Sequence, residues 1–557
     1  MLNPLKLAVM PLLHKALITA YPQCTLPEMI LDRPKDSSWG DVSSTIALRL
    51  AKQFKQSPKN IAENISNHIA DSNIIDSVSV AQNGFINIKL SCHSFLNFLD
   101  FVATKKESYG GVEEKRGKVV VEFVSANPTG PLHVGHGRQG AIGDILSNIM
   151  ATQGWQVHRE FYYNDAGNQI DNLALSVQAR IKGVSPEDAN WPKDGYQGDY
   201  IIDIADNYMK RQYVETDGTT TEGKADPDDL EAICNFAVSF LRKEQNTDLE
   251  LFGIVFDQFY LESSLYKDGT ADLVINRLIE QNKTYEHENA LWLKATEYGD
   301  SKDRVMRKTD GSFTYFVPDV AYHLIKWKRG FEKAINIQGT DHHGTMARVR
   351  AGLQGLDYDI PESYPTYLMH SMVKVFRDGK EVKISKRAGS YVTLRDLIKW
   401  AGKDAVRFFL VSRKPDSDLL FDIDLALKKS EDNPVFYIQY AHARAHSILN
   451  QARNTGFSPC NLDGAVLPEL SMQARLLINL LAEFPDMLKK CTDELSPHLL
   501  PNYLRDLAAA FHGFYNAERV LIEDNIMRTI RMRMVIATKH VLKIGFTILG
   551  ISAPEQM

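Results

Sequence analysis

The sequence contains few cysteines, and none of them forms a Cys-x-x-Cys pair. The five occur far apart in a chain of 557 residues, at Cys24, Cys92, Cys234, Cys460 and Cys491. An odd and dispersed set argues against a disulfide framework and against a structural zinc site. It favours reduced thiols, so we expect a cytoplasmic protein without structural zinc.

Long apolar runs are also absent. No stretch of about 18 apolar residues exists, so a membrane-spanning helix is not expected. The short apolar stretch Leu7–Leu13 is interrupted by Pro11, which favours an amphipathic helix over a signal peptide. The formal net charge of −6 predicts no general affinity for polyanions, although a local basic surface can still bind a nucleic acid.

The hydrophobic pattern divides the chain into three segments. Residues 1–105 mix helical and alternating patterns, as in an α+β domain. Residues 106–427 open with the β-branched run Val119–Val124, typical of a buried parallel strand, and contain an insertion at about 183–300. The periodicity of residues 428–557 is helical. We therefore expect an α/β protein with an N-terminal α+β domain and a C-terminal all-α helical bundle.

The second segment shows the order strand, tight loop and helix. The loop Asn127–Pro131 ends the first strand, and apolar residues from 141 to 149 follow with helical spacing. This order is typical of the opening of a doubly wound nucleotide-binding sheet. Further strands are expected at 334–337 and 373–376, with a helix at 319–328 before the former.

The strongest chemical motif is His133-Val134-Gly135-His136, at the start of the predicted helix. The two imidazoles lie on one face of a first helical turn, whose N–H groups favour phosphate oxygens. His133 and His136 can therefore contact a triphosphate as charge develops, and Gly135 lets a flat base approach. The alternative is a pair of histidines that only caps the helix.

A second motif, Lys383-Ile384-Ser385-Lys386, lies in a polar loop. Ammonium groups suit the charge of a pyrophosphate leaving group, so Lys383, Ser385 and Lys386 form a candidate clamp on ATP. Alone, the loop would be an ordinary solvated charge run. Together with the upstream histidines, it resembles the paired motifs of class I aminoacyl-tRNA synthetases.

The chain is similar to the arginyl-tRNA synthetase family over nearly its whole length. An ordered series of segments carries the resemblance: Trp39-Gly40-Asp41, Gly84-Phe85-Ile86-Asn87, Tyr163 to Gln169, Tyr196 to Ile201, Phe256 to Phe259, Asp404-Ala405-Val406-Arg407 and Ala553 to Met557. The resemblance implies an interrupted Rossmann-type catalytic domain and a helical anticodon-binding domain. It also implies an N-terminal domain that touches the tRNA elbow.

The resemblance further implies an arginine–tRNA ligase of the bacterial type. Such an enzyme activates arginine with ATP and transfers it to the terminal ribose of tRNA(Arg), often only when tRNA is present. His133, His136, Lys383 and Lys386 would be catalytic. A guanidinium is best held by desolvated carboxylates, which we expect to be Glu122 and Asp319. The expected further arginine contacts are Ser125, Asn127, His133 and Tyr315. The alternatives are an ion-pair anchor at Glu122 and a helix cap at Asp319.

The remaining ATP contacts are expected after the predicted strand at 334–337 and at the start of the one predicted at 373–376. We assign Gly339, Asp341, His342, Met372 and Val373 to this role. The Asp-His-His spacing is weak evidence for a metal site, so we expect no metal ligands in the protein and Mg²⁺ bound chiefly through ATP oxygens.

For tRNA, a basic stretch near the C-terminus and one tyrosine attract attention. Arg528 and Arg531 supply phosphate affinity, and Tyr440 offers a stacking surface for an unpaired base. Arg444 and Met557 complete the expected set. The alternative is a solvated helix face with a core tyrosine.

Two other functions compete with this reading. A class I synthetase of another type, such as the cysteinyl one, would need zinc-ligand cysteines that the motifs here lack. A synthetase-like RNA-binding protein without ligase activity would be expected to have lost one of the two motifs. We expect a monomer, as is usual in the family.

Overall fold

The computed structural model describes residues 2–25, 27–165, 167–216, 218–340, 344–382, 391–462 and 464–557. The chain packs as two units. One comprises residues 1–113, 429–494 and 499–557, and the other comprises residues 114–428 and 495–498. The domain boundaries expected at residues 105 and 427 stay predictions.

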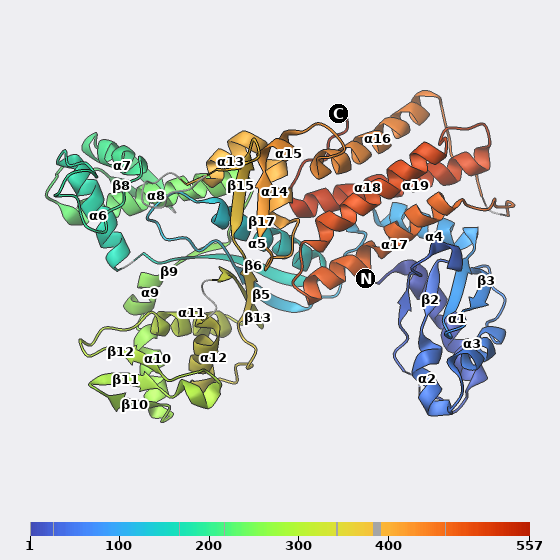
Figure 1. Cartoon of the computed structure of the whole chain (residues 1–557), viewed down its shortest axis with the longest axis horizontal. Helices are drawn as coiled ribbons and strands as arrows, with labels where there is room; N and C mark the ends of the chain where they lie inside the picture. Colours follow the sequence, from blue (N-terminus) through green and yellow to red (C-terminus); the bar gives the residue numbers. More distant parts are fainter. Residues whose placement is uncertain are drawn as a thin grey trace. The chain divides into compact units, whose positions relative to one another are not determined.

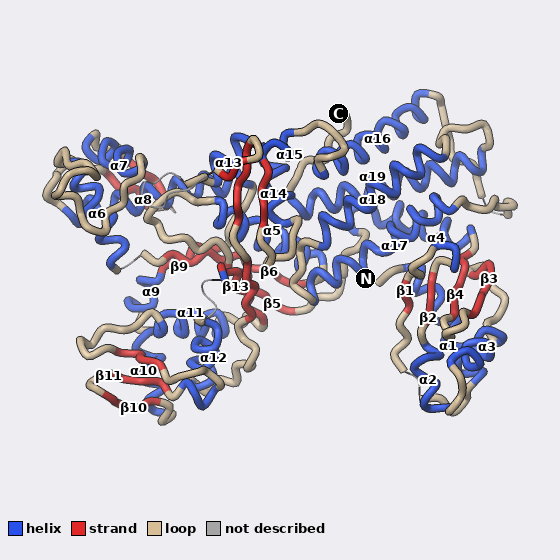
Figure 2. The backbone as a smooth tube through the Cα atoms, in the orientation of Figure 1, coloured by secondary structure: helices blue, strands red, loops and turns tan. Residues whose placement is uncertain are grey.

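A five-stranded parallel sheet forms the centre of the second unit (Figures 1 and 2). Its strand order is β14 (Thr366–His370), β13 (Lys333–Gly339), β5 (Gly117–Glu122), β6 (Trp155–Tyr163) and β9 (Gln258–Leu261). The valines of β5 are fully buried, as the β-branched run predicted. The helix after the motif loop is α5 (Val134–Thr152), which returns the chain to β6. The doubly wound arrangement is confirmed.

The strand expected at 373–376 exists but belongs to another sheet. β15 (Val373–Arg377) pairs with β16 (Lys380–Glu381) and β17 (Leu419–Asp422). The apolar pattern reveals a buried strand but not its partners, because partner choice is a long-range property. The helices on this side of the unit are α13 (Leu394–Ala401), α14 (Lys403–Val411) and α15 (Ile423–Leu427).

The region expected as one insertion at 183–300 contains two separate groups of helices and strands, here called the first and the second body. A strand of the main sheet, β9, lies between them in the sequence. Between them β9 returns to the sheet, where its backbone pairs in parallel with that of β6. The first body contains α6 (Asn168–Ile181), α7 (Tyr200–Met209), β7 (Tyr213–Thr216), β8 (Thr219–Glu222) and α8 (Leu230–Phe252). The second contains α9 (Glu262–Lys267), α10 (Thr270–Glu280), β10 (Thr284–His287), β11 (Ala290–Leu293), the 3₁₀ turn Ala295–Tyr298 and β12 (Arg304–Arg307).

Two further helices complete the second unit. α11 (Phe316–Lys328), expected from 319, and α12 (Thr345–Gly355) pack with the second body around one apolar core. The first body has a separate core, to which α6, α7 and the N-terminal half of α8 contribute.

The first unit combines the two ends of the chain. An antiparallel sheet in the order β1 (Leu31–Asp32), β2 (Val42–Ser44), β4 (Ile86–Leu90), β3 (Ile75–Val80) packs with α1 (Pro4–Ala20), α2 (Ile46–Phe54), α3 (Pro58–Asn67) and α4 (Cys92–Lys105). Two 3₁₀ turns lie at Ser37–Trp39 and Lys106–Ser108. The C-terminal part contributes α16 (Pro434–Asn454), α17 (Met472–Asp493), α18 (Leu499–Ala517) and α19 (Asn525–Leu549). The α+β and all-helical expectations are confirmed.

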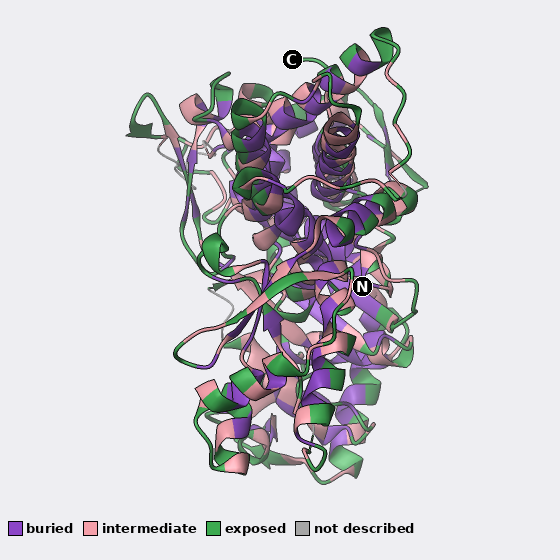
Figure 3. Cartoon of the chain, turned by 90° about the vertical axis from the view of Figure 1, so that its right-hand side faces the viewer, coloured by how far each residue is buried: buried purple, intermediate pink, exposed green. Residues whose placement is uncertain are grey.

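Burial follows the expected periodicity along these helices. In α19, for example, the buried side chains recur at helical spacing, and Figure 3 shows buried and exposed residues alternating around the ribbons. None of the described helices is both long and apolar enough to cross a bilayer.

Candidate active site and nucleic-acid interface

The carboxyl ends of the parallel strands meet at one edge of the main sheet. β5 ends at Glu122. The sheet continues through β6 and β9 on one side of β5 and through β13 and β14 on the other, so the strand order reverses at β5. Ligands of open α/β sheets bind at such a reversal point. The histidine motif follows β5 directly, so it lies at this edge as expected, and Gly339 ends the adjacent strand β13.

A strained bend separates β5 from the motif loop. Val124 and Ser125 both have left-handed backbone angles, with φ of 68° and 41°. This conformation is costly for a β-branched residue and persists where the surroundings hold it. The Ser125 hydroxyl donates to Glu122 Oε1 at 3.1 Å and accepts from the Tyr162 amide at 3.2 Å. The bend therefore brings Ser125 back toward the end of β5.

The two motif histidines form a reciprocal cap on α5. His133 Nδ1 accepts from the amides of Gly135 and His136 at 3.0 and 3.4 Å, and His136 Nδ1 accepts from the His133 amide at 3.3 Å. The rings stack with centroids 3.7 Å apart. Because each Nδ1 accepts, the proton of each neutral ring is on Nε2. Capping and phosphate contact are therefore compatible, since they use different nitrogens.

Packing explains why a glycine occupies position 135, and the sequence did not reveal this explanation. A Cβ at this position would lie 2.8 Å from His133 Cε1. The absence of a side chain thus makes room for the capping ring, in addition to any approach of a base.

The chain that follows the lysine motif lies beside the histidine motif. The Leu394 amide donates to the Leu132 carbonyl at 2.8 Å, and the Val134 amide donates to the Val392 carbonyl at 3.3 Å. These bonds place the start of α13 at the N-terminus of α5. Five expected residues, Lys383, Ser385, Lys386, Asp341 and His342, lie outside the described residues.

The two other expected ATP contacts differ in accessibility. Val373 is buried at the start of β15, whereas the Met372 side chain is 75% exposed. The Val373 side chain is therefore shielded from a ligand, while Met372 offers an apolar surface.

Glu122 already has a basic partner. Its Oε2 lies 2.6 Å from Lys326 Nζ on α11, and the Lys326 side chain is fully buried. Lys326 also donates to Asn336 Oδ1 at 3.2 Å and lies over the Tyr322 ring. This geometry is the ion-pair alternative for Glu122. Sequence reasoning missed Lys326, which lies two residues before the end of the predicted helix 319–328.

Asp319, by contrast, is buried among charges of both signs. Within the described part of the chain no ion pair reaches it. Burial raises its pKa to about 7, the nearby Arg348 opposes this effect, and the charges of Glu262 and Glu122 add to it. Glu262, a second residue that sequence reasoning missed, is buried and accepts from the Tyr162 hydroxyl at 2.9 Å. Burial also raises its pKa. Burial and the neighbouring carboxylates thus outweigh the effect of Arg348 and Lys326 on the pKa of Asp319.

The last two expected arginine contacts are Tyr315 and Asn127, which differ in exposure and in hydrogen bonding. Tyr315 precedes α11 and is 69% exposed. The Asn127 side-chain amide donates to Gln169 Oε1 at 2.5 Å. Among the described residues, no cluster of three or more His, Cys, Asp or Glu side chains has the arrangement of a metal site.

In the first unit, Tyr440 and Arg444 belong to an aromatic and cationic cluster on α16 and α18. Arg444 Nη2 donates to the Tyr440 hydroxyl at 3.0 Å, and its guanidinium lies over the Tyr440 and Tyr515 rings. The Tyr440 ring stacks on His512, whose pKa burial lowers to about 4. Half-buried rings beside a guanidinium form a suitable platform for an unpaired base.

The arginines of α19 are occupied within the protein. Arg528 Nη1 donates to the Ile522 carbonyl at 3.0 Å, and Arg531 pairs with Glu518 at 2.6 Å. Arg533 pairs with Asp100 at 2.7 Å. The expected tRNA contacts of Arg528 and Arg531 stay predictions. Met557, at the C-terminus, is 53% exposed.

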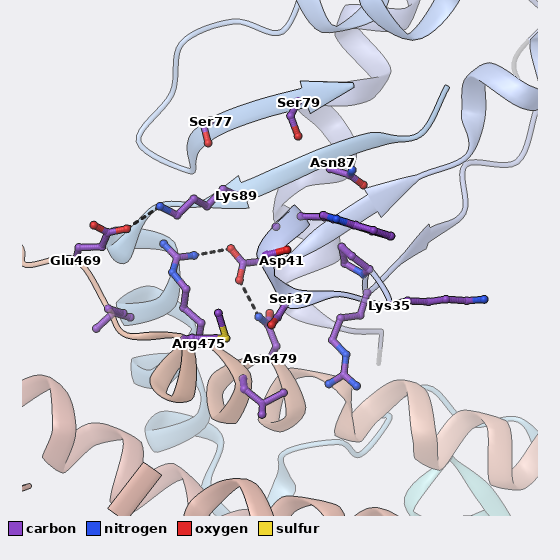
Figure 4. A pocket seen from close by; sticks show the side chains of 18 residues that line it. Lys35, Ser37, Asp41, Ser77, Ser79, Asn87, Lys89, Glu469, Arg475 and Asn479 are labelled. Atoms are coloured by element: carbon purple, nitrogen blue, oxygen red, sulfur yellow. Dashed lines mark hydrogen bonds and ion pairs between the residues drawn. The ribbon is translucent and has the colours of Figure 1, made fainter. Parts of the chain in front are cut away.

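A cavity of about 410 Å³ lies between the N-terminal sheet and α17 (Figure 4). At its base, the Asp41 carboxylate accepts from Arg475 at 2.6 Å and from Asn479 at 2.9 Å. The wall carries Lys35 and Lys89, and Trp39 is 54% exposed at the same cavity. Lys89 is paired with Glu469 at 2.7 Å, so Lys35 and the exposed Trp39 ring are the features of this cavity that suit a nucleotide.

Comparison with known protein families accounts for three stretches of the chain. Residues 99–417 match the model described as tRNA synthetases class I (R), catalytic domain. Residues 9–90 match the arginyl tRNA synthetase N terminal domain, and residues 438–557 match the DALR anticodon binding domain.

Similar proteins extend the match to the whole chain. Arginine–tRNA ligase of Burkholderia thailandensis is 53% identical, covering 96% of this chain and 94% of the relative. That of Paraburkholderia phymatum is 52% identical over 95% of this chain and 94% of the relative. The structure of Thermus thermophilus arginyl-tRNA synthetase has the same fold, with a TM-score of 0.75, 22% identity and coverage of 98% and 99% of the two chains.

Proposed function

Because the chain belongs to the arginyl-tRNA synthetase family and is an arginine–tRNA ligase, we propose that the carboxyl edge of its parallel sheet activates arginine with ATP. In this step a carboxylate oxygen of arginine attacks the α-phosphorus, and pyrophosphate leaves. The terminal ribose hydroxyl of tRNA(Arg) then attacks the carbonyl carbon of the adenylate, and AMP leaves.

The proposed phosphate contacts are the Nε2–H groups of His133 and His136. Their Nδ1 atoms are used by the cap, so the rings are held in one orientation before ATP binds. Preorganised donors are most effective where charge develops in the transition state. Lys383 and Lys386 would neutralise the leaving pyrophosphate, and Mg²⁺ would bind through the ATP oxygens.

The proposed guanidinium anchor is Asp319, supported by Glu262 and Tyr315. The observation that carries this proposal is the raised pKa of Asp319 in a site where Lys326 already neutralises Glu122. A bound guanidinium would supply the positive charge that the remaining carboxylates lack. Glu122, paired with Lys326, would then orient Ser125 for the α-amino end of the substrate.

For tRNA, we propose two contacts on the first unit. The platform of Tyr440 and Arg444 would stack an anticodon base, and the cavity beside Trp39 would take a nucleotide of the tRNA elbow. A monomeric enzyme in the cytoplasm, acting on ATP with Mg²⁺, is consistent with this scheme.

The test is ATP–pyrophosphate exchange with each amino acid, with and without total tRNA. We expect exchange with arginine alone, and only when tRNA is present. Exchange with a different amino acid would overturn the proposed guanidinium site. Exchange in no condition would overturn the proposed activity and leave RNA binding as the function to test.

A further inference from the structure

One turn of α8 holds both flanks of the ATP site. On this turn the buried Gln245 amide donates to the carbonyl of Asn127 at 3.0 Å and to that of Gly130 at 2.8 Å. Asn127 and Gly130 belong to the loop that leads into the histidine motif. The first flank is thus attached to α8 through its backbone.

The second flank is attached to the same turn through Arg395 on α13. Arg395 Nη1 donates to Glu244 Oε2 at 2.8 Å, and Nε donates to Asp248 Oδ1 at 2.5 Å. The Asp248 side chain is buried, whereas those of Arg395 and Glu244 are partly exposed. Glu244 and Asp248 are four residues apart, about 6 Å along the helix axis. The two flanks are therefore fixed at one separation by a rigid element.

The remainder of α8 belongs to the first body of the insertion. Its N-terminal half carries buried apolar side chains of that body's core, such as Ile233 and Phe236. In Figure 1, α8 runs from the region of α6 and α7 toward α13. A second residue of this body, Tyr200 at the start of α7, donates to the Thr129 carbonyl at 2.8 Å. The motif loop is thus held by the insertion at three of its carbonyls.

We propose that Gln245, Tyr200 and Arg395 are positioning residues of the adenylation step. They set the distance between the histidine motif and the segment that follows the lysine motif, so that both close on one triphosphate. This inference rests on the proposed function, and it assigns to the insertion a direct part in the geometry of the ATP site.

The orientation of the Gln245 amide makes the proposal specific. Its nitrogen faces two carbonyl oxygens, so only a donor fits, and Gln245→Glu would place a carboxylate oxygen against them. Gln245→Met keeps the length of the side chain but removes both hydrogen bonds; the Asn127 carbonyl would retain the Thr129 amide at 2.8 Å, whereas the Gly130 carbonyl would lose its Gln245 donor. Tyr200→Phe removes a single hydroxyl, and Arg395→Lys keeps the charge without the two-pronged contact.

The experiment measures arginine-dependent exchange for each variant, with Glu250→Ala as the control because Glu250 is an exposed residue of the same helix. We expect kcat to fall about tenfold to a hundredfold in Gln245→Met and about twofold to tenfold in Tyr200→Phe. The KM values for ATP and arginine should change less than threefold. The reason is that a displaced loop weakens the contacts that stabilise the transition state more than it weakens ground-state binding of the substrates.

Two further measurements separate positioning from general stability. Hydrogen–deuterium exchange over residues 126–137 should rise in Gln245→Met and not in Glu250→Ala. The double variant Gln245→Met/Arg395→Lys should lose less than the product of the two single losses, since both act through one turn. Losses that multiply, or that follow the change in melting temperature, would overturn the proposal. If the wild type showed no exchange, the proposed function itself would fail. Normal exchange in every variant would refute only the positioning role.

Discussion

Lys326 Nζ lies 2.6 Å from Glu122 Oε2, and the two side chains are 0% and 8% exposed. A lysine on a helix thus neutralises the carboxylate at the end of the central strand. Asp319, three residues into the same helix, makes no ion pair among the described residues and lies near the charges of Arg348, Glu262 and Glu122.

We expect Lys326→Met to reduce the free energy of unfolding by about 3–5 kcal/mol, because the buried Glu122 carboxylate would lose its counter-charge. Urea or guanidinium unfolding measures this change. Lys328→Met, at an exposed position of the same helix, is the matched control. The double variant Lys326→Met/Glu122→Gln should recover much of the loss, and equal effects in the two single lysine variants would contradict the buried pair.

Arginine affinity should depend on pH through Asp319. Its pKa of about 7 means that the free enzyme binds a proton there as the pH falls below neutrality. A guanidinium requires the ionised form, so the KM for arginine should rise below pH 7, approaching tenfold per pH unit. Steady-state exchange between pH 5.5 and 8.5 measures this profile. Asp319→Asn should show weak affinity and a flat profile, and an equally flat wild-type profile would exclude Asp319 as the anchor.

Gly135→Ala should separate stability from activity. Alanine stabilises a helix by about 1 kcal/mol relative to glycine. At this position, however, its Cβ would displace the His133 ring. We expect exchange to fall by about tenfold or more while thermal unfolding hardly changes. Gly513→Ala, where an added Cβ meets no neighbour, is the control and should keep full activity. An active Gly135→Ala enzyme would show that the ring position is unimportant.

Tyr440→Ala should weaken tRNA binding. Stacking of one base on an aromatic ring contributes about 1–3 kcal/mol, which corresponds to about fivefold to 150-fold in affinity. Filter binding or the KM for tRNA in aminoacylation measures the effect. Arg533→Gln, whose charge is already paired with Asp100, should change affinity less than twofold. A similar small effect for Tyr440→Ala would remove the stacking role.

The sequence predicted the elements whose pattern is local. The strand at Val119–Val121, the helix after His133 and the C-terminal helices all follow from runs and periodicities of neighbouring residues. The partners of β15 could not be read in this way, and neither could the return of β9 to the main sheet, because strand pairing depends on distant segments.

The same limit applies to the site. His133 and His136 were found because a short motif carries them. The partnership of Lys326 with Glu122, 204 residues apart, and the contact of Gln245 with the loop 118 residues earlier have no local signature. The internal contacts of the α19 arginines likewise have no local signature, because Glu518 and Asp100 lie outside α19, and the tRNA role of Arg528 and Arg531 stays a prediction.

The link between Asp41 and Arg475 has a consequence for synthesis of the protein. The two residues are 434 positions apart, so at about 5–20 residues per second the ribosome needs about 20–90 s to deliver the partner of this carboxylate. During that interval the face of the N-terminal sheet that will meet α17 is in contact with water. The polar side chains of Ser77, Ser79 and Lys89 lie on that face and interact favourably with water. The nascent domain therefore exposes little apolar surface to other chains before α17 is synthesised.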